Sequence, residues 1–440
     1  MGTTDHRHSG ETMSEDSAAH RPEDPKRVVM MSLHTSPLAQ AGRGDAGGLN
    51  VYVNALSRAL AARGTEVDIV TTDLDSEYDD GSSGDSCRSL SDGRRVHVLR
   101  VCDTCRRDKS RLIECLNDLA HRALQSLQAA SARRVDVVHS HYWISGLAAL
   151  TVSSALDAEL VHTMHTIGAV KHERDPCAQE DPRRHAAEER IVSSAAQLTA
   201  NTAGEAADLQ RIFGVPEHRI TVVAPGVDLS VFRPPARPDA RWEQPWGPQR
   251  PVRLTFAGRL QPHKGPQVAV AAVGHLRQLL PEVPVQLTVA GRQSGADAVE
   301  ITELAAAWGV SDAVMLTDPL PHPQLAQLFR GSDAVLVPSY SESFGLVALE
   351  AMACGTPVLA HQVGGLAELV RHRETGLLID TLEPAVWAQQ IRWLTSQTHR
   401  PRRISQSAAQ LAQHYSWDST AARAVKAYRQ ASAHIARTPS

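Results

Sequence analysis

Short apolar runs alternate with longer amphipathic stretches along the chain from Lys26 onward. Each run has the length and composition of a buried strand, and each stretch has those of a crossover helix, so the alternation predicts a parallel sheet covered by helices. We therefore expect an N-terminal α/β domain over residues 26–232. Its expected strands are RVVMMSL (27–33), EVDIVTT (66–72), VDVVHS (135–140), ELVHTM (159–164), LTANT (198–202) and ITVVAPG (220–226).

Residues 233–251 interrupt this pattern with repeated prolines and two tryptophans, which is typical of an interdomain linker. A second series of runs predicts a second doubly wound domain over residues 252–414, so that two Rossmann-like domains face each other across a cleft. Residues 415–440 are expected to form a closing helix and tail. The strands of the second series are VRLTFAG (252–258), VQLTVAG (285–291), AVMLTD (313–318), AVLVPS (334–339), TPVLAH (356–361) and GLLID (376–380).

The composition is that of a globular protein. Hydrophobic residues make up 42% and charged residues 21% of the 440 residues, which suffices for two domains with substantial cores. The net charge of -4 gives no overall nucleic-acid signature. Residues 1–25 lack the apolar run of a signal peptide, and no later stretch has the roughly 18 apolar residues of a membrane helix. We expect a disordered tail at residues 1–25 and a cytoplasmic protein that binds neither nucleic acid nor membrane.

The six cysteines fit free thiols in a reducing compartment better than a disulfide framework. Cys102 and Cys105 form a C-x-x-C pair with Cys87 and Cys115 nearby, so a small zinc site is one interpretation. The spacing outside the pair is irregular, which favours incidental thiols over stoichiometric zinc.

Ligands of doubly wound domains bind beyond the carboxyl ends of the strands, where loops and helix N-termini converge. The first strand runs into a glycine-rich segment, residues 34–53, ahead of a helical pattern. Clustered glycines at such a turn let backbone N–H groups approach an anion. A tight connection without a ligand is an equally good explanation of glycines at this place.

The second domain places Arg259 and Lys264 on the loop after its first strand. Two cations at this spacing are able to grip a pyrophosphate through charge-assisted hydrogen bonds. The alternative is a solvated loop with two ordinary surface charges.

Glu342 and Glu350 lie eight residues apart and flank a glycine-bearing turn at a helix start. Because a carboxylate accepts hydrogen bonds from paired hydroxyls, one glutamate suits a sugar and the other a ribose. Two alternatives are a glycosidase-like carboxylate pair and two ordinary helix charges. Gly364 and Gly365, after the next strand, are expected to allow further backbone approach to a ligand.

Together these segments resemble the retaining GT-B-type glycosyltransferases. The E-x7-E signature of that family matches Glu342 to Glu350, and its G-R-L-x-x-x-K-G segment matches at Arg259 and Lys264. The resemblance covers residues 26–428 and is greatest to the group that transfers N-acetylglucosamine to an inositol phosphate at the start of mycothiol synthesis. It implies a GT-B fold, a UDP-N-acetylglucosamine donor, a 1D-myo-inositol 3-phosphate acceptor and a homodimer.

The resemblance also implies roles for single residues. Pyrophosphate contacts fall on Arg259 and Lys264, the sugar contact on Glu342 and the ribose contact on Glu350. The implied catalytic set consists of His165, Arg259, Lys264 and Glu342. Further donor contacts fall on Gln40, Ala41, Gly48 and Leu320. Acceptor contacts fall on His34, Asp45, Ala46, Gly47, Gly48, Leu49, Asn50, Lys109, Tyr142, Thr166 and Arg184. A structural Mg²⁺ would lie at Phe329, Arg330, Ser332 and Thr356.

Three features separate this chain from the family pattern. Ala41 replaces a proline that is usual at this place, and residues 72–112 lack most of the family's sequence motifs. A one-residue length difference leaves open whether Arg183 or Arg184 contacts the phosphate. His165 lies beside the donor sugar by resemblance, whereas a lone histidine after a buried strand is more often a packing residue.

The mechanism implied by the family is front-face transfer with retention, in which the donor phosphate takes the acceptor proton. Two alternatives stay open. One is a sucrose-phosphate-synthase-like transferase with another phosphorylated acceptor, and the other is a non-catalytic nucleotide-sugar sensor. A membrane-associated lipid glycosyltransferase is disfavoured because no basic amphipathic helix with a broad aromatic face is found in the sequence.

Overall fold

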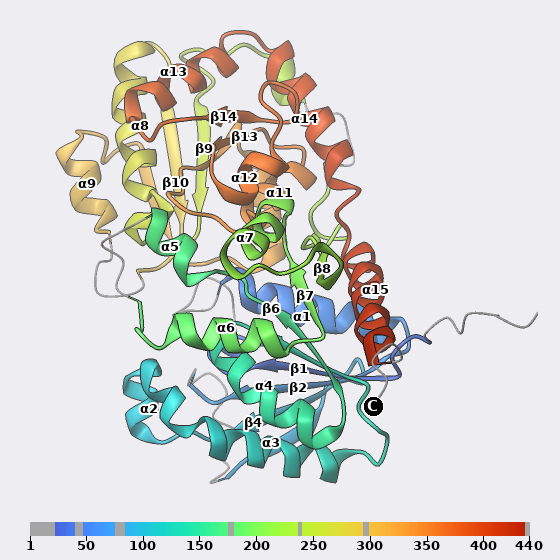
Figure 1. The fold of residues 1–440 in the computed structure, drawn as a ribbon. Coiled ribbons are helices and arrows are strands. Elements are labelled where there is room, and N and C mark those ends of the chain that lie inside the picture. Colours follow the sequence, from blue (N-terminus) through green and yellow to red (C-terminus); the bar gives the residue numbers. More distant parts are fainter. Residues whose placement is uncertain are drawn as a thin grey trace, which may run out of the picture.

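The computed structural model describes residues 23–39, 47–74, 84–174, 180–235, 240–293 and 299–435. Two α/β domains are stacked along the long axis of the molecule, with the N-terminal domain at the bottom of Figure 1 and the C-terminal domain at the top. Each domain has one sheet with helices on its faces, which confirms the doubly wound architecture predicted from the apolar runs.

The N-terminal sheet has the strand order β3-β4-β2-β1-β5-β6-β7-β8. The six predicted runs all form parallel strands, most of which are buried on both faces, as the fully buried β1 illustrates, whereas β8 at one edge is partly exposed. The strands are β1 (Arg27–Ser32), β2 (Glu66–Thr72), β3 (Ser86–Ser89), β4 (Arg95–Leu99), β5 (Val137–His141), β6 (Glu159–Thr163), β7 (Gln197–Ala200) and β8 (Ile220–Val222).

The helices of this domain cover both faces of the sheet and begin close to the carboxyl ends of the strands that precede them. They are α1 (Gly48–Ala62), α2 (Asp103–Arg107), the 3-10 helix η2 (Lys109–Cys115), α3 (Leu116–Ala130), α4 (Trp143–Leu156), α5 (Gly168–Arg174), α6 (Arg184–Ser194), α7 (Ala203–Phe213) and the 3-10 helix η3 (Glu217–Arg219).

The C-terminal sheet is entirely parallel, with the order β11-β10-β9-β12-β13-β14. Its strands are β9 (Val252–Ala257), β10 (Val285–Ala290), β11 (Val314–Thr317), β12 (Ala334–Val337), β13 (Val358–His361) and β14 (Leu377–Ile379). Its helices are η4 (Ala240–Glu243), η5 (Pro262–Lys264), α8 (Pro266–Leu279), α9 (Ile301–Ala307), α10 (His322–Gly331), α11 (Leu346–Ala353), α12 (Gly364–Leu369), α13 (Pro384–Thr395) and α14 (His399–Ala412).

The last helix, α15 (Trp417–Ile435), leaves the C-terminal domain and packs on the N-terminal one (Figure 1). Its Ala424 and Tyr428 are buried in the same cluster as Val28 and Met30 of β1. The Tyr428 hydroxyl also hydrogen-bonds Nδ1 of His139 at 2.8 Å. The N-terminal core is therefore built from both ends of the chain.

The hairpin of β3 and β4 was not predicted from the sequence. β3 pairs antiparallel with β4, and β4 pairs parallel with β2 at the edge of the sheet. β4 carries Arg95 in place of a further apolar residue, and the Arg95 guanidinium lies 2.6 Å from the buried Asp68 carboxylate. β3 is the edge strand, and its sequence SCRS contains no apolar run that would predict a strand.

Part of the segment expected to be a linker packs against the C-terminal domain. Trp242 is buried, and the Trp246 indole donates to the Asp333 carboxylate at 3.1 Å. Over the part of the chain that the structure describes, no helix is both long and apolar enough to cross a membrane.

Candidate active site

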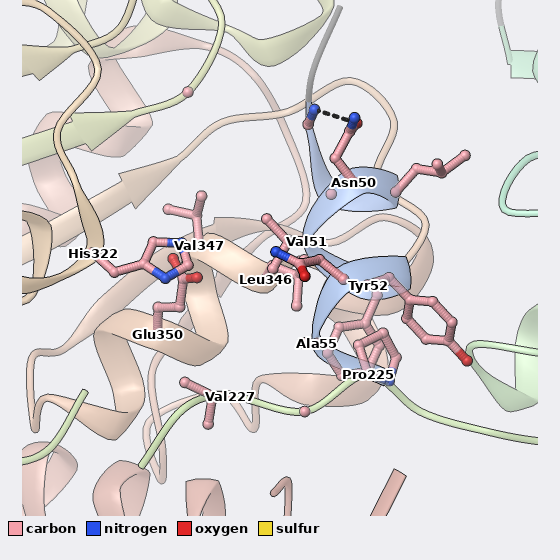
Figure 2. Close-up of a pocket in the computed structure, with 18 of the residues that line it drawn as sticks. Asn50, Val51, Tyr52, Ala55, Pro225, Val227, His322, Leu346, Val347 and Glu350 are labelled. Atoms are coloured by element: carbon pink, nitrogen blue, oxygen red, sulfur yellow. Dashed lines mark hydrogen bonds between the residues drawn. The ribbon is translucent and has the colours of Figure 1, made fainter. Parts of the chain in front are cut away.

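A cavity of about 1070 Å³ lies between the two domains. The N-terminal wall comes from the loop after β1, from α1 and from the loops after β5 and β6, and the C-terminal wall comes from the loops after β9 and β12 and from α11. Figure 2 shows Asn50, Val51 and Tyr52 of α1 on one side and Leu346, Val347 and Glu350 of α11 on the other.

Lys264 reaches the cavity because of the glycine that follows it. Gly265 has φ of +75°, and a Cβ at this position would lie 2.0 Å from the Pro338 carbonyl oxygen. Only glycine permits such an approach of the loop after β9 to the end of β12. Tyr340 N then donates to the His263 carbonyl at 2.8 Å and joins the two loops. The contact brings residues that are far apart in sequence into one corner of the cavity, which Arg259 also lines.

Glu342 and Glu350 line the cavity in different electrostatic states. Glu342 accepts a hydrogen bond from Lys264 Nζ at 2.8 Å, and both side chains are about one-fifth exposed. Glu350 is buried, and burial raises the pKa of its carboxyl to about 8. Burial is the single cause of this raised pKa, and no hydrogen bond contributes to it. A buried carboxyl of this kind is suited to bind hydroxyl groups that enter with a ligand.

The paired glycines after β13 have a different role from the one expected. A Cβ on Gly365 would lie 2.3 Å from the Phe344 Cα, and Gly365 N donates to the Glu342 carbonyl at 3.1 Å. Neither Gly364 nor Gly365 is among the described residues that line the cavity. These glycines let α12 pack against the turn that carries Glu342, and so they position that turn from behind.

His165 stands at the boundary of the two domains. It is a buried non-glycine residue with φ of +60°, and burial lowers the pKa of its imidazole to about 3. Its Nε2 hydrogen-bonds Nδ1 of His141 at 3.0 Å, and its carbonyl accepts from Ser343 Oγ of the other domain at 2.6 Å. The ring is therefore neutral near pH 7, and its orientation is fixed by a second histidine.

The expected acceptor residues at the start of α1 form a rigid turn. The buried Asn50 amide donates to Thr35 Oγ1 at 2.8 Å and to the Ser36 carbonyl at 2.5 Å, and its oxygen accepts from Gly47 N at 3.0 Å. This side chain holds the loop after β1 against the helix N-terminus. The described residues of this set that line the cavity are His34, Gly47, Gly48, Leu49, Asn50, Tyr142 and Thr166.

Arg184 is the buried member of the arginine pair, and it does not line the cavity. Its guanidinium donates to the Glu188 carboxylate at 2.6 Å, to Glu180 at 2.7 Å, and to the carbonyl and hydroxyl oxygens of Thr166 at 2.7 and 2.9 Å. It also lies 5.1 Å from the centre of the Tyr142 ring. In this arrangement Arg184 fixes two cavity-lining residues and has its donors engaged.

Other expected site residues have different surroundings. Arg183 is exposed and pairs with Asp181 at 2.6 Å. Lys109 begins η2 and is outside the set of residues that line the cavity, whereas Leu320 is inside it. Gln40, Ala41, Asp45 and Ala46 lie outside the described residues.

The four positions expected for Mg²⁺ do not offer a typical magnesium site. The Phe329 carbonyl already accepts from Thr356 Oγ1 at 2.7 Å and from Ser332 N at 3.0 Å. The Arg330 guanidinium donates to the Val231 carbonyl at 3.3 Å. None of the four residues has a carboxylate, the group through which proteins usually bind this ion. We therefore assign no step of the chemistry to a metal here.

The residues that join the two walls were not predicted from the sequence. Ser343 contacts the His165 carbonyl, and Glu368 of α12 accepts from Ala203 N and Gly204 N, at 3.0 and 2.7 Å, at the start of α7. The only sequence signal for Ser343 is its place beside Glu342. Glu368 has none, because its partners are more than 160 residues away.

Comparisons with known proteins show the family to which the chain belongs. The family model Glycosyl transferase 4-like domain matches residues 47–226, and Glycosyl transferases group 1 matches residues 238–411. The chain is 41% identical over 408 residues to the D-inositol 3-phosphate glycosyltransferase of Pseudarthrobacter chlorophenolicus, covering 92% of this chain and 96% of that protein. It is 38% identical over 415 residues to the same-named protein of Rhodococcus jostii, covering 92% and 90% of the two chains.

Among solved structures, sucrose-phosphate synthase from Thermosynechococcus elongatus superposes with a TM-score of 0.79 at 28% identity, over 93% of this chain and 100% of that one. A UDP complex of Anabaena HepE superposes with a TM-score of 0.67 at 18% identity, over 91% and 98% of the two chains, and shares the fold. The chain is thus a glycosyltransferase enzyme, and it belongs to the GT-B family that includes the D-inositol 3-phosphate glycosyltransferases.

Proposed function

We propose that the protein transfers N-acetylglucosamine from UDP-N-acetylglucosamine to 1D-myo-inositol 3-phosphate with retention, as the first step of mycothiol synthesis. The observation that carries the proposal is the corner where Arg259, Lys264, Glu342 and Glu350 line one interdomain cavity. The names of the curated relatives support the inositol phosphate acceptor.

The donor fits this corner by charge and by hydrogen bonding. A UDP-sugar brings a pyrophosphate, which needs cations, and two sets of hydroxyls, which need acceptors. Arg259 and Lys264 would bind the pyrophosphate, and Glu350 would accept from the ribose hydroxyls. Glu342, which is paired with Lys264 at 2.8 Å, would accept from the sugar hydroxyls.

Negative charge develops on the departing UDP, so Lys264 and Arg259 would stabilise the transition state electrostatically. Front-face transfer is supported by the state of the neighbouring groups. His165 Nε2 is hydrogen-bonded to His141 at 3.0 Å, and Glu342 is ion-paired with a lysine, so neither resembles a free nucleophile. In this proposal the donor phosphate takes the proton of the acceptor hydroxyl as that oxygen bonds to the anomeric carbon.

A product assay tests the proposal. Purified enzyme is supplied with UDP-N-acetylglucosamine and 1D-myo-inositol 3-phosphate, and the product is identified by mass spectrometry, with NMR of its anomeric proton. We expect an α-linked product, because retention preserves the α configuration of the donor. Release of UDP with no sugar–inositol product, or donor binding without turnover over an acceptor panel, would contradict it. The second result would indicate a nucleotide-sugar sensor.

One observation favours a second candidate acceptor. The sucrose-phosphate synthase structure superposes over 93% of this chain with a TM-score of 0.79. Its name indicates another phosphorylated product, so a phosphorylated hexose is the competing acceptor class. Fructose 6-phosphate should be assayed beside inositol 3-phosphate at the same saturating donor, and the larger kcat/KM identifies the acceptor.

A further inference from the structure

Three cysteine thiols converge in the N-terminal domain, away from the cavity residues. Cys102 Sγ lies 3.4 Å from Cys105 Sγ, and Cys105 Sγ lies 3.6 Å from Cys115 Sγ. All three sulfurs lie within 4.8 Å of one another. From the irregular spacing of these cysteines alone, thiols without a metal were the favoured interpretation. In the structure, however, the turn from α2 into η2 brings Cys115 back to the C-x-x-C pair.

This triangle has the dimensions of a metal–thiolate site. A Zn–S bond is about 2.3 Å long, so two sulfurs on one tetrahedral ion are about 3.8 Å apart. The two measured separations, 3.4 and 3.6 Å, are close to this value before any ion draws the sulfurs into place. A disulfide would need only two of the three thiols, whereas the third comes from a different helix and completes one face of a tetrahedron.

The surroundings of the sulfurs suit an ion that enters from solvent. Cys102 is exposed, Cys105 is buried and Cys115 is half-buried, so the triangle has one open side. A cation bound here would displace the protons of the thiols that ligate it.

We propose that Cys102, Cys105 and Cys115 bind one Zn²⁺ ion through three thiolates, with a solvent molecule as the fourth ligand. Thiolates select soft and borderline cations, and a three-protein-ligand zinc site with an open position is an established geometry. Binding exchanges the thiol protons for the metal and involves no change of oxidation state.

Such a site would fix a segment that sequence analysis connected with the acceptor. The ion would join the residue before α2 to the end of η2, and Lys109 lies between these two points. Ordering of Lys109 toward an acceptor phosphate rests on the proposed function, whereas metal binding itself does not.

Cobalt titration tests the site directly, because Co²⁺ takes the same ligands and is coloured. The reduced full-length protein, freed of metal by a chelator, is titrated with Co²⁺ and then with Zn²⁺. We expect one Co²⁺ per chain, with sulfur-to-cobalt charge-transfer bands and the visible bands of a tetrahedral ion, and their loss on addition of Zn²⁺.

Two single variants locate the ligands without disturbing the buried thiol. Cys102→Ser and Cys115→Ser should each weaken Co²⁺ binding at least about 100-fold, since even the loss of a group that only supports a ligand costs 10- to 100-fold. Cys87→Ser is the matched control, because Cys87 lies on β3 and contacts His97 at 3.9 Å. It should bind as the parent does.

The proposal is overturned if the parent protein, with all six thiols shown to be reduced, takes up no Co²⁺. It is equally overturned if both serine variants, shown to be folded by circular dichroism, bind Co²⁺ as tightly as the parent protein.

Discussion

On the C-terminal wall of the cavity, Lys264 and Glu342 lie 2.8 Å apart, line the open space and remain partly exposed. On the N-terminal side, Arg184 is buried behind the wall and is surrounded by Glu188, Glu180 and Thr166. One arrangement leaves its charges within reach of a ligand, and the other uses a charge to hold two carboxylates and a threonine in place. The hydrogen-bond partners that a cation already has therefore indicate its role better than its distance from the cavity does.

The first prediction concerns the buried arginine. Arg184→Ala should lower the free energy of unfolding by about 3–5 kcal/mol, because it leaves the buried Glu188 carboxylate without its cation. Urea denaturation followed by circular dichroism measures this change. Arg183→Ala, on the neighbouring exposed arginine, is the control and should change stability little. A fully stable Arg184→Ala protein with a selective loss of acceptor phosphate recognition would show that Arg184 belongs to the site and not to its support.

The second prediction concerns the exposed pair. Lys264→Ala should lower kcat by about 10²–10³-fold without unfolding the protein, since one preorganised charge on the leaving group is removed. Steady-state kinetics with saturating donor and acceptor measure this effect. Arg277→Ala is the control, because this cation lies on α8 and pairs with Asp312 at the surface.

A double-variant cycle sharpens the same prediction. Glu342→Gln should impair transfer by itself, and its effect should be smaller in the Lys264→Ala background if the two side chains act as one unit. If the two losses are strictly additive, the ion pair between Lys264 and Glu342 does not contribute to turnover.

The third prediction asks whether Lys109 reads phosphate. Lys109→Ala should reduce kcat/KM for inositol 3-phosphate by about 30- to 1000-fold, equivalent to about 2–4 kcal/mol, and should leave kcat/KM for unphosphorylated inositol nearly unchanged. Arg107→Ala removes a neighbouring exposed cation as a control. Equal losses on both acceptors would remove Lys109 from the acceptor site and leave the donor assignment intact.

The smallest expected effect is that of pH on stability. The contributions of the buried histidines on the N-terminal side and of Glu350 on the C-terminal side should change with pH in opposite directions. Burial lowers the pKa of four histidines in and behind the N-terminal wall, so below about pH 6.5 the unfolded chain binds protons that the folded chain does not. Stability is then lost as the pH falls. The pKa of Glu350 is raised to about 8 against an ordinary 4.5, so its contribution to stability is lost as the pH rises through that range. The histidines are His139, His141, His162 and His165.

Unfolding free energies measured from pH 5 to 6.5 separate these contributions. Glu350→Gln should make the increase of stability with pH steeper, and His162→Asn should make it shallower, each by about 1.4 kcal/mol per pH unit. Parallel pH profiles for the parent protein and both variants would show that these groups titrate as they do in the unfolded chain.

Both sheets were predictable because every strand of a buried parallel sheet needs a continuous apolar run, and such runs stand out in the sequence. The hairpin of β3 and β4 was not predictable, since its stability depends on the ion pair between Arg95 and Asp68, which are 27 residues apart in the sequence. Arg259, Lys264, Glu342 and Glu350 were predictable as a group because each lies in a short segment after a strand.

What was not predictable in the site was which groups are already engaged. The pairing of Lys264 with Glu342 spans 78 residues, and the enclosure of Arg184 depends on the path of α6 beside Thr166. The loop lengths and crossings that decide such contacts leave no trace in residue spacing. For the same reason the sequence suggested a ligand-facing role for Gly365, which the structure uses for packing against Phe344.

The return of α15 to the N-terminal domain has a consequence for biosynthesis. Protein domains generally fold in the order in which they leave the ribosome, N-terminal first. Here Ala424 and Tyr428 complete the cluster that contains Val28 and Met30, so that cluster stays open until the end of the chain has been made. The C-terminal domain is translated in full before then and is able to fold first. During synthesis, the part of this cluster that α15 covers therefore stays exposed until α15 has left the ribosome, and it is accessible to chaperones over most of translation.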